Sequence, residues 1–373
     1  MARHVVVVGA GIIGMAVAMR IRQRNWEVTI LEAARPGAGA SSAALGSLTP
    51  YSDHGCSLAT RRIAELSVAT YPKWITELKS LSGSDIDFDD SGLLELAIGK
   101  EEEAALRSSF SVLQGSNAPV EWLDADSVHQ MEPNATPETV GAIYYKSEAM
   151  VDVTQLLVAC ERAILRLGCR IASATRVTRI LESAGRIQGV ETQSGTLRSD
   201  AVVIATGANL ATIQGVPRIP IERVRGEVVE VKAVPGLVGR HLYSGDGFMT
   251  PRRNGRILLG SNYDVHVHGD DECPSTASAR SVLRTLAATI RMVPAISSLQ
   301  LQRTWKEWRP RTPDGQPVVG CIGPEGLVVA TGFFGLGITL SPAIGEIVAE
   351  ILDGKVSALA DSLNPGRFFD GSQ

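Results

Sequence analysis

The chain has 373 residues and a formal net charge of −4, with a sequence pI of about 5.9. This length favours two domains, and a hydrophobic content of 44% is ample for a large core. Because no global basic field exists, we expect no nucleic-acid partner, and pairs such as Arg252-Arg253 should lie on solvated faces. Five cysteines without a C-x-x-C pattern favour a reducing compartment and predict neither a disulfide framework nor a metal site.

The location of the protein is predicted from the apolar segments. Residues 5–19 resemble a signal peptide superficially, but their glycines explain them as a strand, a turn and a helix. No segment is long and apolar enough to span a bilayer. We therefore expect a cytoplasmic protein, and leave open a peripheral contact with the inner face of the membrane.

The first 32 residues carry the most informative pattern. The string VVVVGAGIIG places Gly9, Gly11 and Gly14 between an apolar strand and an apolar helix. Such glycines permit a tight turn, close approach of the backbone to a pyrophosphate, and close packing of helix on strand. After a second strand over residues 27–31, Glu32 lies 23 positions beyond Gly9, where a carboxylate can bind a ribose diol. The pattern predicts a dinucleotide-binding unit; the alternative is an ordinary glycine-rich turn.

A loop of small residues follows, PGAGASSAALGSLTP over residues 36–50. Glycine, alanine and serine allow a backbone to approach a large ligand closely and supply N–H and hydroxyl donors. A flexible linker is the alternative, but Leu45, Leu48 and Tyr51 are apolar anchors that a linker does not need.

The periodicity then predicts a series of elements as far as a second glycine turn. Helices are expected over residues 58–81, 101–113, 122–131 and 154–167, and strands within 85–98 and over 169–171, 176–181, 187–192 and 200–205. The last strand is buried and runs into Thr206 and Gly207, a turn at a sheet edge where a nucleotide can lie.

The remaining chain predicts a second sheet and then a return to the first. Strands are expected over residues 224–231, 248–250, 257–260, 318–319 and 327–330, and helices over 276–292 and 341–352. The overall prediction is an α/β fold: a Rossmann-type domain from the discontinuous segments 1–80, 146–220 and 312–373. A second, α+β domain with an antiparallel sheet is expected from segments 81–145 and 221–311.

Three further strings carry a family resemblance: GASSAALG from residue 39, WRPRTPDGQPVVG from residue 308, and TGFFGLGITLSP from residue 331. With the N-terminal glycines, they resemble the flavin-dependent amine and amino-acid oxidoreductases of the D-amino-acid oxidase superfamily. The nearest branches are the glycine oxidases and the D-amino-acid dehydrogenases. The resemblance covers nearly the whole chain and implies FAD as the cofactor.

The resemblance also implies where FAD is held. The pyrophosphate would lie at Gly9 to Gly14, the ribose on Glu32 and the adenine near Val177, with the isoalloxazine ring between residues 41–46 and 335–339. The sarcosine oxidase branch attaches its flavin through a cysteine in the segment matching 307–312, where this chain has none, so non-covalent FAD is expected. The implied cofactor residues are Gly9, Gly11, Ile12, Ile13, Gly14, Glu32, Ala33, Ser41, Ser42, Ala44, Gly46, Val177, Thr206, Gly207, Arg309, Gly335, Leu336, Gly337, Ile338 and Thr339.

Arg309 matches the arginine with which the family binds its substrate carboxylate, and a guanidinium suits that bidentate grip. The alternatives are that Arg309 pairs with Asp314 or Glu307, or that Arg311 is the clamp. The other expected site residues are Tyr51, His54, Tyr243 and Phe248. Glycine oxidases have a tyrosine at position 248 and an arginine at position 335, so glycine is not expected to be the preferred substrate.

The resemblance implies oxidation of the C–N bond of an amino acid or cyclic imino acid, D-configured or N-substituted. A hydride passes from the α-carbon to flavin N5, and the resulting imine hydrolyses. No catalytic base is identified. The sarcosine oxidase branch activates O2 with a lysine in a region matching part of 251–305, and no lysine occurs there. This favours a dehydrogenase that reduces a quinone or carrier over an oxidase that reduces O2.

Two alternatives are left open. One is an FAD-dependent 2-hydroxy-acid dehydrogenase, which would need a base for the hydroxyl proton. The other is a flavoprotein subunit that works with a partner chain in a hetero-oligomeric dehydrogenase. Whether the chain forms a homo-oligomer is likewise left open.

Overall fold

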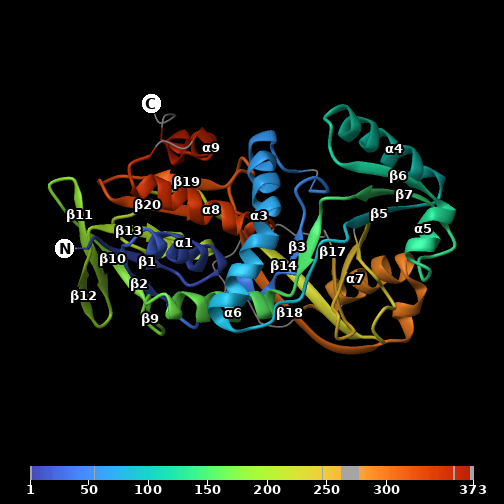
Figure 1. The fold of residues 1–373 in the computed structure, drawn as a ribbon, viewed down its shortest axis with the longest axis horizontal. Coiled ribbons are helices and arrows are strands. Elements are labelled where there is room, and N and C mark those ends of the chain that lie inside the picture. The colour runs from blue at the N-terminus through green and yellow to red at the C-terminus, as the bar shows by residue number, and fades with distance from the viewer. Residues whose placement is uncertain (1, 54, 246, 262–276, 356–357, 370–373) are drawn as a thin grey trace.

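The computed structural model describes residues 2–53, 55–245, 247–261, 277–355 and 358–369. Two large sheets occupy opposite ends of the elongated molecule (Figure 1). The expected combination of a Rossmann-type sheet with a second sheet is confirmed. The domain boundaries themselves stay a prediction.

The first sheet has six strands in the order β19-β20-β13-β1-β2-β9. Five of them run parallel, and β19 pairs antiparallel with β20. Val5, Val6 and Val7 of the central strand are fully buried, as expected of a parallel strand that is covered on both faces. The strands are β1 (His4–Val8), β2 (Glu27–Leu31), β9 (Arg170–Ala172), β13 (Ala201–Ile204), β19 (Val318–Cys321) and β20 (Leu327–Thr331).

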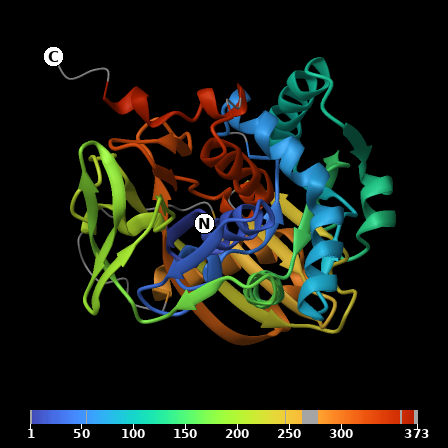
Figure 2. The ribbon, with the colours of Figure 1, turned by 60° about the vertical axis from the view of Figure 1, so that its left-hand side comes forward.

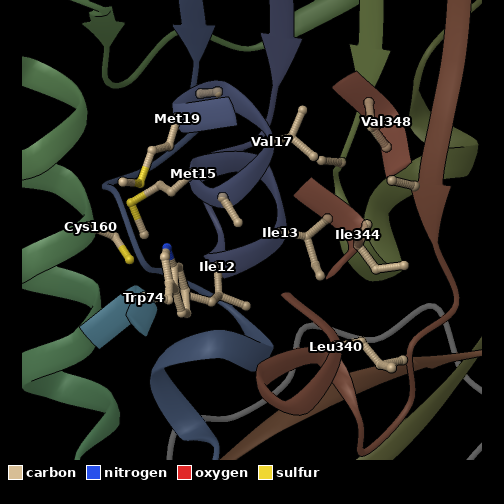
Figure 3. Close-up of a cluster of buried hydrophobic side chains, with 14 of the residues drawn as sticks. Ile12, Ile13, Met15, Val17, Met19, Trp74, Cys160, Leu340, Ile344 and Val348 are labelled. Carbon is tan, nitrogen blue, oxygen red and sulfur yellow. The ribbon is translucent and has the colours of Figure 1, made fainter. Parts of the chain in front are cut away.

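Four helices form the core on one face of this sheet: α1 (Ile12–Gln23), α3 (Leu58–Ser82), α6 (Val153–Arg166) and α8 (Gly337–Leu352). Helices α1 and α8 lie side by side (Figure 2). In Figure 3, Met15 and Met19 of α1 point toward Cys160 of α6, while Ile13 and Val17 point toward α8. Because α1 packs on both neighbours, its position fixes the turn that precedes it.

The opposite face of the six-stranded sheet is covered by a small antiparallel sheet. Val6 and Val8 of β1 pack there in one cluster with Ile180 and Val190. The covering strands are β10 (Val177–Ser183), β11 (Arg186–Thr192) and β12 (Gly195–Arg198).

The second large sheet has eight strands in the order β18-β14-β17-β16-β15-β5-β7-β6, and only β15 and β5 pair in parallel. Its strands are β5 (Leu93–Ile98), β6 (Val120–Asp124), β7 (Thr139–Tyr145), β14 (Glu222–Lys232), β15 (His241–Ser244), β16 (Gly247–Pro251), β17 (Arg256–Ser261) and β18 (Gln300–Arg311). Helices α4 (Lys100–Gly115), α5 (Ala125–Met131) and α7 (Ala279–Met292) pack against it.

A three-stranded sheet, β3-β8-β4, lies between the two large sheets (Figure 1). It consists of β3 (Ser47–Leu48), β4 (Phe88–Asp89) and β8 (Ala149–Val151). The short helices are α2 (Ala40–Ala43), α9 (Ala358–Asp361) and the 3-10 turns η1 (Gly207–Thr212), η2 (Pro294–Ser298) and η3 (Pro365–Phe368). Among the residues placed by the structure, no helix combines the length and apolarity needed to cross a membrane.

Several local predictions are wrong. The helix expected over 122–131 begins only at Ala125, because Val120–Asp124 pairs with β7 as an edge strand. The C-terminal helix begins at Gly337, four residues before the predicted start at 341.

Gly345 on α8 lets this helix approach α1 closely. A Cβ there would lie 2.8 Å from the Ala16 carbonyl oxygen, which belongs to the backbone and cannot move aside alone. We expect Gly345→Ala to lower the free energy of unfolding by about 1–3 kcal/mol, measured by urea denaturation. Gly115→Ala at the end of α4 is the matched control, since its new Cβ meets no atom within 4 Å. Equal stability of the two variants would contradict the close helix contact.

Candidate active site

The turn between β1 and α1 is a backbone cradle from which side chains are excluded. Gly9 has φ +105°, and a Cβ on it would lie 2.5 Å from the Ala205 carbonyl oxygen. A Cβ on Gly14 would lie 2.0 Å from the Gly9 carbonyl oxygen. The Gly11 N-cap leaves the first N–H groups of α1 at the turn, and the Ile12 N–H donates to Ser41 Oγ over 3.0 Å. This geometry is suited to a bound pyrophosphate.

The Glu32 carboxylate is held in place at the end of β2. Its Oε2 accepts the Ala10 N–H and its Oε1 accepts the Ala34 N–H, each over 2.8 Å. The side chain is half-buried and each oxygen keeps a lone pair. Glu32 can therefore accept further hydrogen bonds from a diol without giving up its protein partners.

A cavity of about 440 Å³, here called the nucleotide-side cavity, runs along this turn. Thr206 Oγ1 is buried and has no hydrogen-bond partner in the part of the chain that the structure describes, which marks a polar group available to a ligand. The implied cofactor residues that line the cavity are Gly9, Gly11, Ile12, Ile13, Glu32, Ala33, Ser41, Ala44, Val177, Thr206, Gly207, Gly335, Gly337 and Ile338.

Other implied cofactor residues are not in this wall. Gly14 packs behind Gly9, and the Thr339 hydroxyl donates to the Ser47 carbonyl over 3.3 Å. Leu336 is buried as the N-cap of α8, and Ser42 Oγ donates to the Gly39 carbonyl. Lining residues that the sequence did not single out include Ala34, Ala38, Thr175, Arg176, Ala205, Ala208, Asn209 and Trp308.

A second cavity of about 420 Å³, the sheet-side cavity, adjoins the first. Both are lined by Ala40, Ala44, Glu307, Phe334, Gly335 and Ile338, so the two spaces meet at these residues. The eight-stranded sheet contributes Leu93, Val228, His241, Tyr243, Phe248 and Arg309 to the second cavity, and the loop after α2 contributes Gly46, Ser47, Thr49, Ser52 and Asp53.

Arg309 lies across strand β14 because position 226 has no side chain. A Cβ on Gly226 would lie 2.5 Å from Arg309 Nε, so the guanidinium occupies the space a side chain would fill. Its central carbon is 5.7 Å from the centre of the Phe334 ring. The half-buried guanidinium thus lies at the sheet-side cavity near the residues that both cavities share.

Of the two carboxylates named as alternative partners of Arg309, Asp314 already has an arginine partner, while the pairing with Glu307 stays a prediction. The Asp314 carboxylate pairs with Arg367 at 2.7 Å, and Glu307 Oε2 accepts the backbone N–H of Trp308. Arg311 also approaches the Phe334 ring, at 5.6 Å, but does not line either cavity.

The Phe248 ring lies over a glycine of the neighbouring strand, as the Arg309 guanidinium lies over Gly226. It pairs directly with Gly260 across β16 and β17, and a Cβ there would lie 2.2 Å from the Phe248 ring. Phe248 packs with Leu45, Val228, Leu258 and Trp305. This apolar cluster forms one wall beside Arg309, so the cavity combines a cation with an apolar surface.

Sequence reasoning missed His241. It is 4% exposed, its Nδ1 has no hydrogen-bond partner among the described residues, and its Nε2 lies 3.4 Å from Ser47 Oγ. Burial, reinforced by the charge of Arg252, lowers the pKa of His241 to about 3. The sequence feature that could have pointed to His241 is its position two residues before Tyr243, because positions 241 and 243 lie on one face of a strand.

Arg252 is buried, contrary to the expected solvated face. Its guanidinium donates to the carbonyl oxygens of Leu45 and Pro251, and lies 3.7 Å from Asp152. Burial lowers its pKa to about 10, although the Asp152 charge opposes this. Arg252 therefore ties the loop at Leu45 to the second sheet.

The remaining expected site residues differ in placement. Tyr243 lines the sheet-side cavity. Tyr51 instead packs its ring in the apolar cluster behind it, where burial and Glu65 raise its pKa to about 12. His54 lies outside the described residues.

Two adjoining cavities, one along the glycine turn of a dinucleotide-type fold and one with the Arg309 guanidinium in its wall, would suit a cofactor next to a small anionic ligand. Residues 4–351 match the family model described as DAO, FAD dependent oxidoreductase. The chain belongs to this family, whose cofactor is FAD.

The relatives agree with this assignment. The chain is 32% identical to the glycine oxidase of Geobacillus kaustophilus (strain HTA426) over 365 residues, 95% of this chain and 94% of that protein. A crystal structure of glycine oxidase from Geobacillus kaustophilus is similar with a TM-score of 0.88 at 30% identity, covering 96% of both chains. L-proline dehydrogenase from P. horikoshii shares the fold, with a TM-score of 0.86 at 24% identity over 100% of this chain and 99% of that one.

Gly226→Ala is expected to displace Arg309, because the new Cβ would overlap Nε. We expect the Kd of a carboxylate ligand to rise at least about tenfold, as for a misplaced charge-assisted bond. Titration of the FAD absorption spectrum measures it, with Gly115→Ala as control. An unchanged Kd would show that Arg309 does not bind the ligand from this position.

His241 makes stability depend on pH. The unfolded chain binds a proton at this residue below about pH 6.5, whereas the folded chain resists protonation until about pH 3. The free energy of unfolding should therefore fall as pH decreases through this window, by up to about 1.4 kcal/mol per pH unit.

His241→Gln removes this contribution, so its stability should depend less steeply on pH between 6.5 and 4 than that of the wild type. Urea denaturation across the range measures the difference. His129→Gln on α5 is the control, since that half-buried ring lies outside both cavities. Parallel profiles for wild type and His241→Gln would contradict a neutral buried imidazole.

Proposed function

We propose that the protein is an FAD-dependent enzyme that oxidises the C–N bond of an amino acid or cyclic imino acid. The observation that carries this proposal is the guanidinium of Arg309, held at a cavity that shares a wall with the nucleotide-side cavity. A planar guanidinium is the preferred group for bidentate recognition of a carboxylate. The similarity to a glycine oxidase over 95% of the chain supports an amino acid as substrate.

The residues around the nucleotide-side cavity fit FAD. The glycine turn and the first N–H groups of α1 would hold its pyrophosphate, and Glu32 its ribose. Thr206 Oγ1 supplies a buried polar group to which no described residue is hydrogen-bonded. None of the described residues that line either cavity is a cysteine, which supports non-covalent attachment.

FAD, when bound, supplies an acceptor for the hydride of the substrate α-carbon. The protein contributes mainly orientation. Arg309 binds the carboxylate at one end, while Phe248 and Val228 cover the side of the substrate beside it. Two fixed contacts on a small molecule limit the directions in which its α-carbon can point, which is how positioning accelerates a reaction.

The start of α8 adds an electrostatic contribution. Gly335, Gly337 and Ile338 line the nucleotide-side cavity, and the helix N-cap has no side-chain hydrogen bond. Free N–H groups at a helix N-terminus carry partial positive charge. They would stabilise negative charge that develops on a reduced cofactor beside them.

The cavity favours a substrate larger than glycine. A Cβ on Gly335 would meet no atom within 4 Å, so the cavity is open there. The wall of Phe248, Leu45 and Val228 is apolar and would lose favourable contacts with a substrate that has no side chain. We infer an amino acid with an apolar side chain or ring, and electron transfer to a quinone or carrier in preference to O2.

The central experiment is anaerobic bleaching of the bound flavin by D-, L-, N-methyl and cyclic amino acids. We expect one apolar amino acid to bleach it, and readmission of oxygen to restore the colour slowly. A preparation that no amino acid bleaches would overturn the proposal, and rapid reoxidation by O2 would overturn the preference for a carrier.

Arg309→Ala should raise the KM of that amino acid by about 10²-fold, because the carboxylate loses a charge-assisted bidentate partner. Arg311→Ala is the matched control, since Arg311 lies two residues along the same strand and lines neither cavity. If both variants raise KM equally, Arg309 is not the specific clamp.

A further inference from the structure

Oxidation of an amine by hydride loss needs the amine neutral, whereas amino acids in water carry an ammonium group. The sequence did not identify a group that accepts the proton of this ammonium group. His241 lines the cavity, but its lowered pKa makes it a poor proton acceptor at neutral pH. A buried carboxylate behind the cavity wall offers another route.

Glu148 lies just before β8 and is fully buried. Its Oε1 accepts the N–H groups of Tyr51 and Ser52, over 3.0 and 2.6 Å. Its Oε2 accepts the Ser52 hydroxyl over 2.7 Å. Ser52 itself lines the sheet-side cavity, so its hydroxyl links the buried carboxylate to the cavity.

The direction of the Ser52 hydroxyl follows from the charge of Glu148. A hydroxyl has one hydrogen, and an ionised carboxylate only accepts hydrogen bonds. While Glu148 is ionised, the Ser52 hydrogen points to Oε2 and the oxygen lone pairs remain for other donors. Ser52 therefore offers an acceptor to an ammonium group in the cavity.

On the basis of the proposed amine oxidation, we propose that Ser52 and Glu148 form a proton relay that deprotonates the substrate ammonium group. The ammonium N–H gives its proton to Ser52 Oγ as the Ser52 hydroxyl proton moves to Glu148 Oε2. The substrate becomes a neutral amine and Glu148 a carboxylic acid, so total charge is unchanged. After product leaves, the proton returns along the same two bonds to water in the cavity.

The surroundings of Glu148 suit it to this exchange. Burial raises the pKa of Glu148 to about 7, although hydrogen bonds from Ser52 and Tyr51 lower it, and the charge of Glu95 adds a smaller increase. A pKa near neutrality lets a group both accept and release a proton. The titratable groups that face Glu148, directly or through a neighbour, are Glu95 on β5, Tyr145 on β7, Tyr243 on β15, Tyr51, and Arg61 and Glu65 on α3.

Tyr145 and Tyr51 do not compete for the proton, because both keep their own protons at neutral pH. Tyr145 donates its hydroxyl to Glu95 over 2.6 Å, and burial raises its pKa above the ordinary range. Burial, together with the charge of Glu65, also raises the pKa of Tyr51. Glu95 is buried behind Tyr145 and does not line the cavity.

The test compares Ser52→Ala and Glu148→Gln with wild-type holoenzyme in anaerobic bleaching from pH 6 to 10. Glutamine keeps the contacts, because its oxygen can accept both N–H groups and its amide can donate to Ser52. Near pH 7.5 we expect both variants to bleach about 10²-fold more slowly, a typical effect of losing a proton acceptor. Above the pKa of the free substrate amine the three rates should converge.

Two further variants separate the relay from structural support. Ser52→Thr keeps a hydroxyl and should retain most of the rate. Glu132→Gln is the matched control, because Glu132 is also buried and also accepts a backbone N–H, from Gly239, but lines neither cavity. The relay would be overturned if the bleaching rates of Ser52→Ala and Glu148→Gln were lowered by the same factor at every pH, or if Ser52→Ala kept the pH profile of the wild type. Asp53 or Glu307 would then be left as the proton acceptor.

Binding provides a readout that does not require turnover. 2-Aminoisobutyrate has an ammonium group but no hydrogen on its α-carbon, whereas isobutyrate has only the carboxylate. As pH rises toward the pKa of Glu148, the carboxylate ionises, and the affinity of the wild type for 2-aminoisobutyrate should increase by up to about tenfold per pH unit. Glu148→Gln should lose this increase, and isobutyrate should show none in either protein. An increase that persists in Glu148→Gln would overturn the relay.

The relay and the proposed function fail in different ways. If no amino acid bleaches the wild-type flavin, the proposed function is overturned and the relay with it. If the wild type is bleached and the variants keep its pH profile, the relay alone is overturned.

Discussion

The loop between α2 and α3 is held by two buried charged side chains of opposite sign, and both cavities depend on this restraint. Arg252 donates to the Leu45 carbonyl at one end, and Glu148 accepts the N–H groups of Tyr51 and Ser52 at the other. Removing a buried charged partner costs more than its bonds contribute, because the group left behind is desolvated. These contacts fix the loop at Leu45 and at Tyr51 and Ser52.

The second sheet faces this loop, and two of its glycines leave space on the surface of the sheet for neighbouring side chains. Gly226 and Gly260 leave room for the Arg309 guanidinium and the Phe248 ring to lie along the strands. Glycine costs conformational entropy in a strand, so its presence at both positions indicates close approach of another group. A charged end and an apolar wall, both rigid, can orient an amino acid by two different kinds of contact.

Local rules predicted much of the first sheet. The glycines of the first turn, the carboxylate of Glu32 and the buried strand before Thr206 depend on short-range geometry, so their pattern is visible in the sequence. The edge strand Val120–Asp124 was mistaken for a helix because pairing with β7, and not local periodicity, determines its conformation. The pairing of β14, which was predicted as a strand, with β18 also depends on long-range contacts, and it aligns Val224 with Arg309.

The sequence by itself predicted a dinucleotide-binding turn at Gly9 to Gly14, and it singled out Arg309 through a string that resembles a family. These features depend on residues close together in the chain or on strings long enough to resemble a family. Only the tertiary structure decided which groups meet across the cavities. His241, Ser52 and Glu148 come from three separate segments, and Arg252 is buried although its sequence indicates a solvated face. Burial and pairing at long range, which change the charge a side chain carries, are not properties of any short segment.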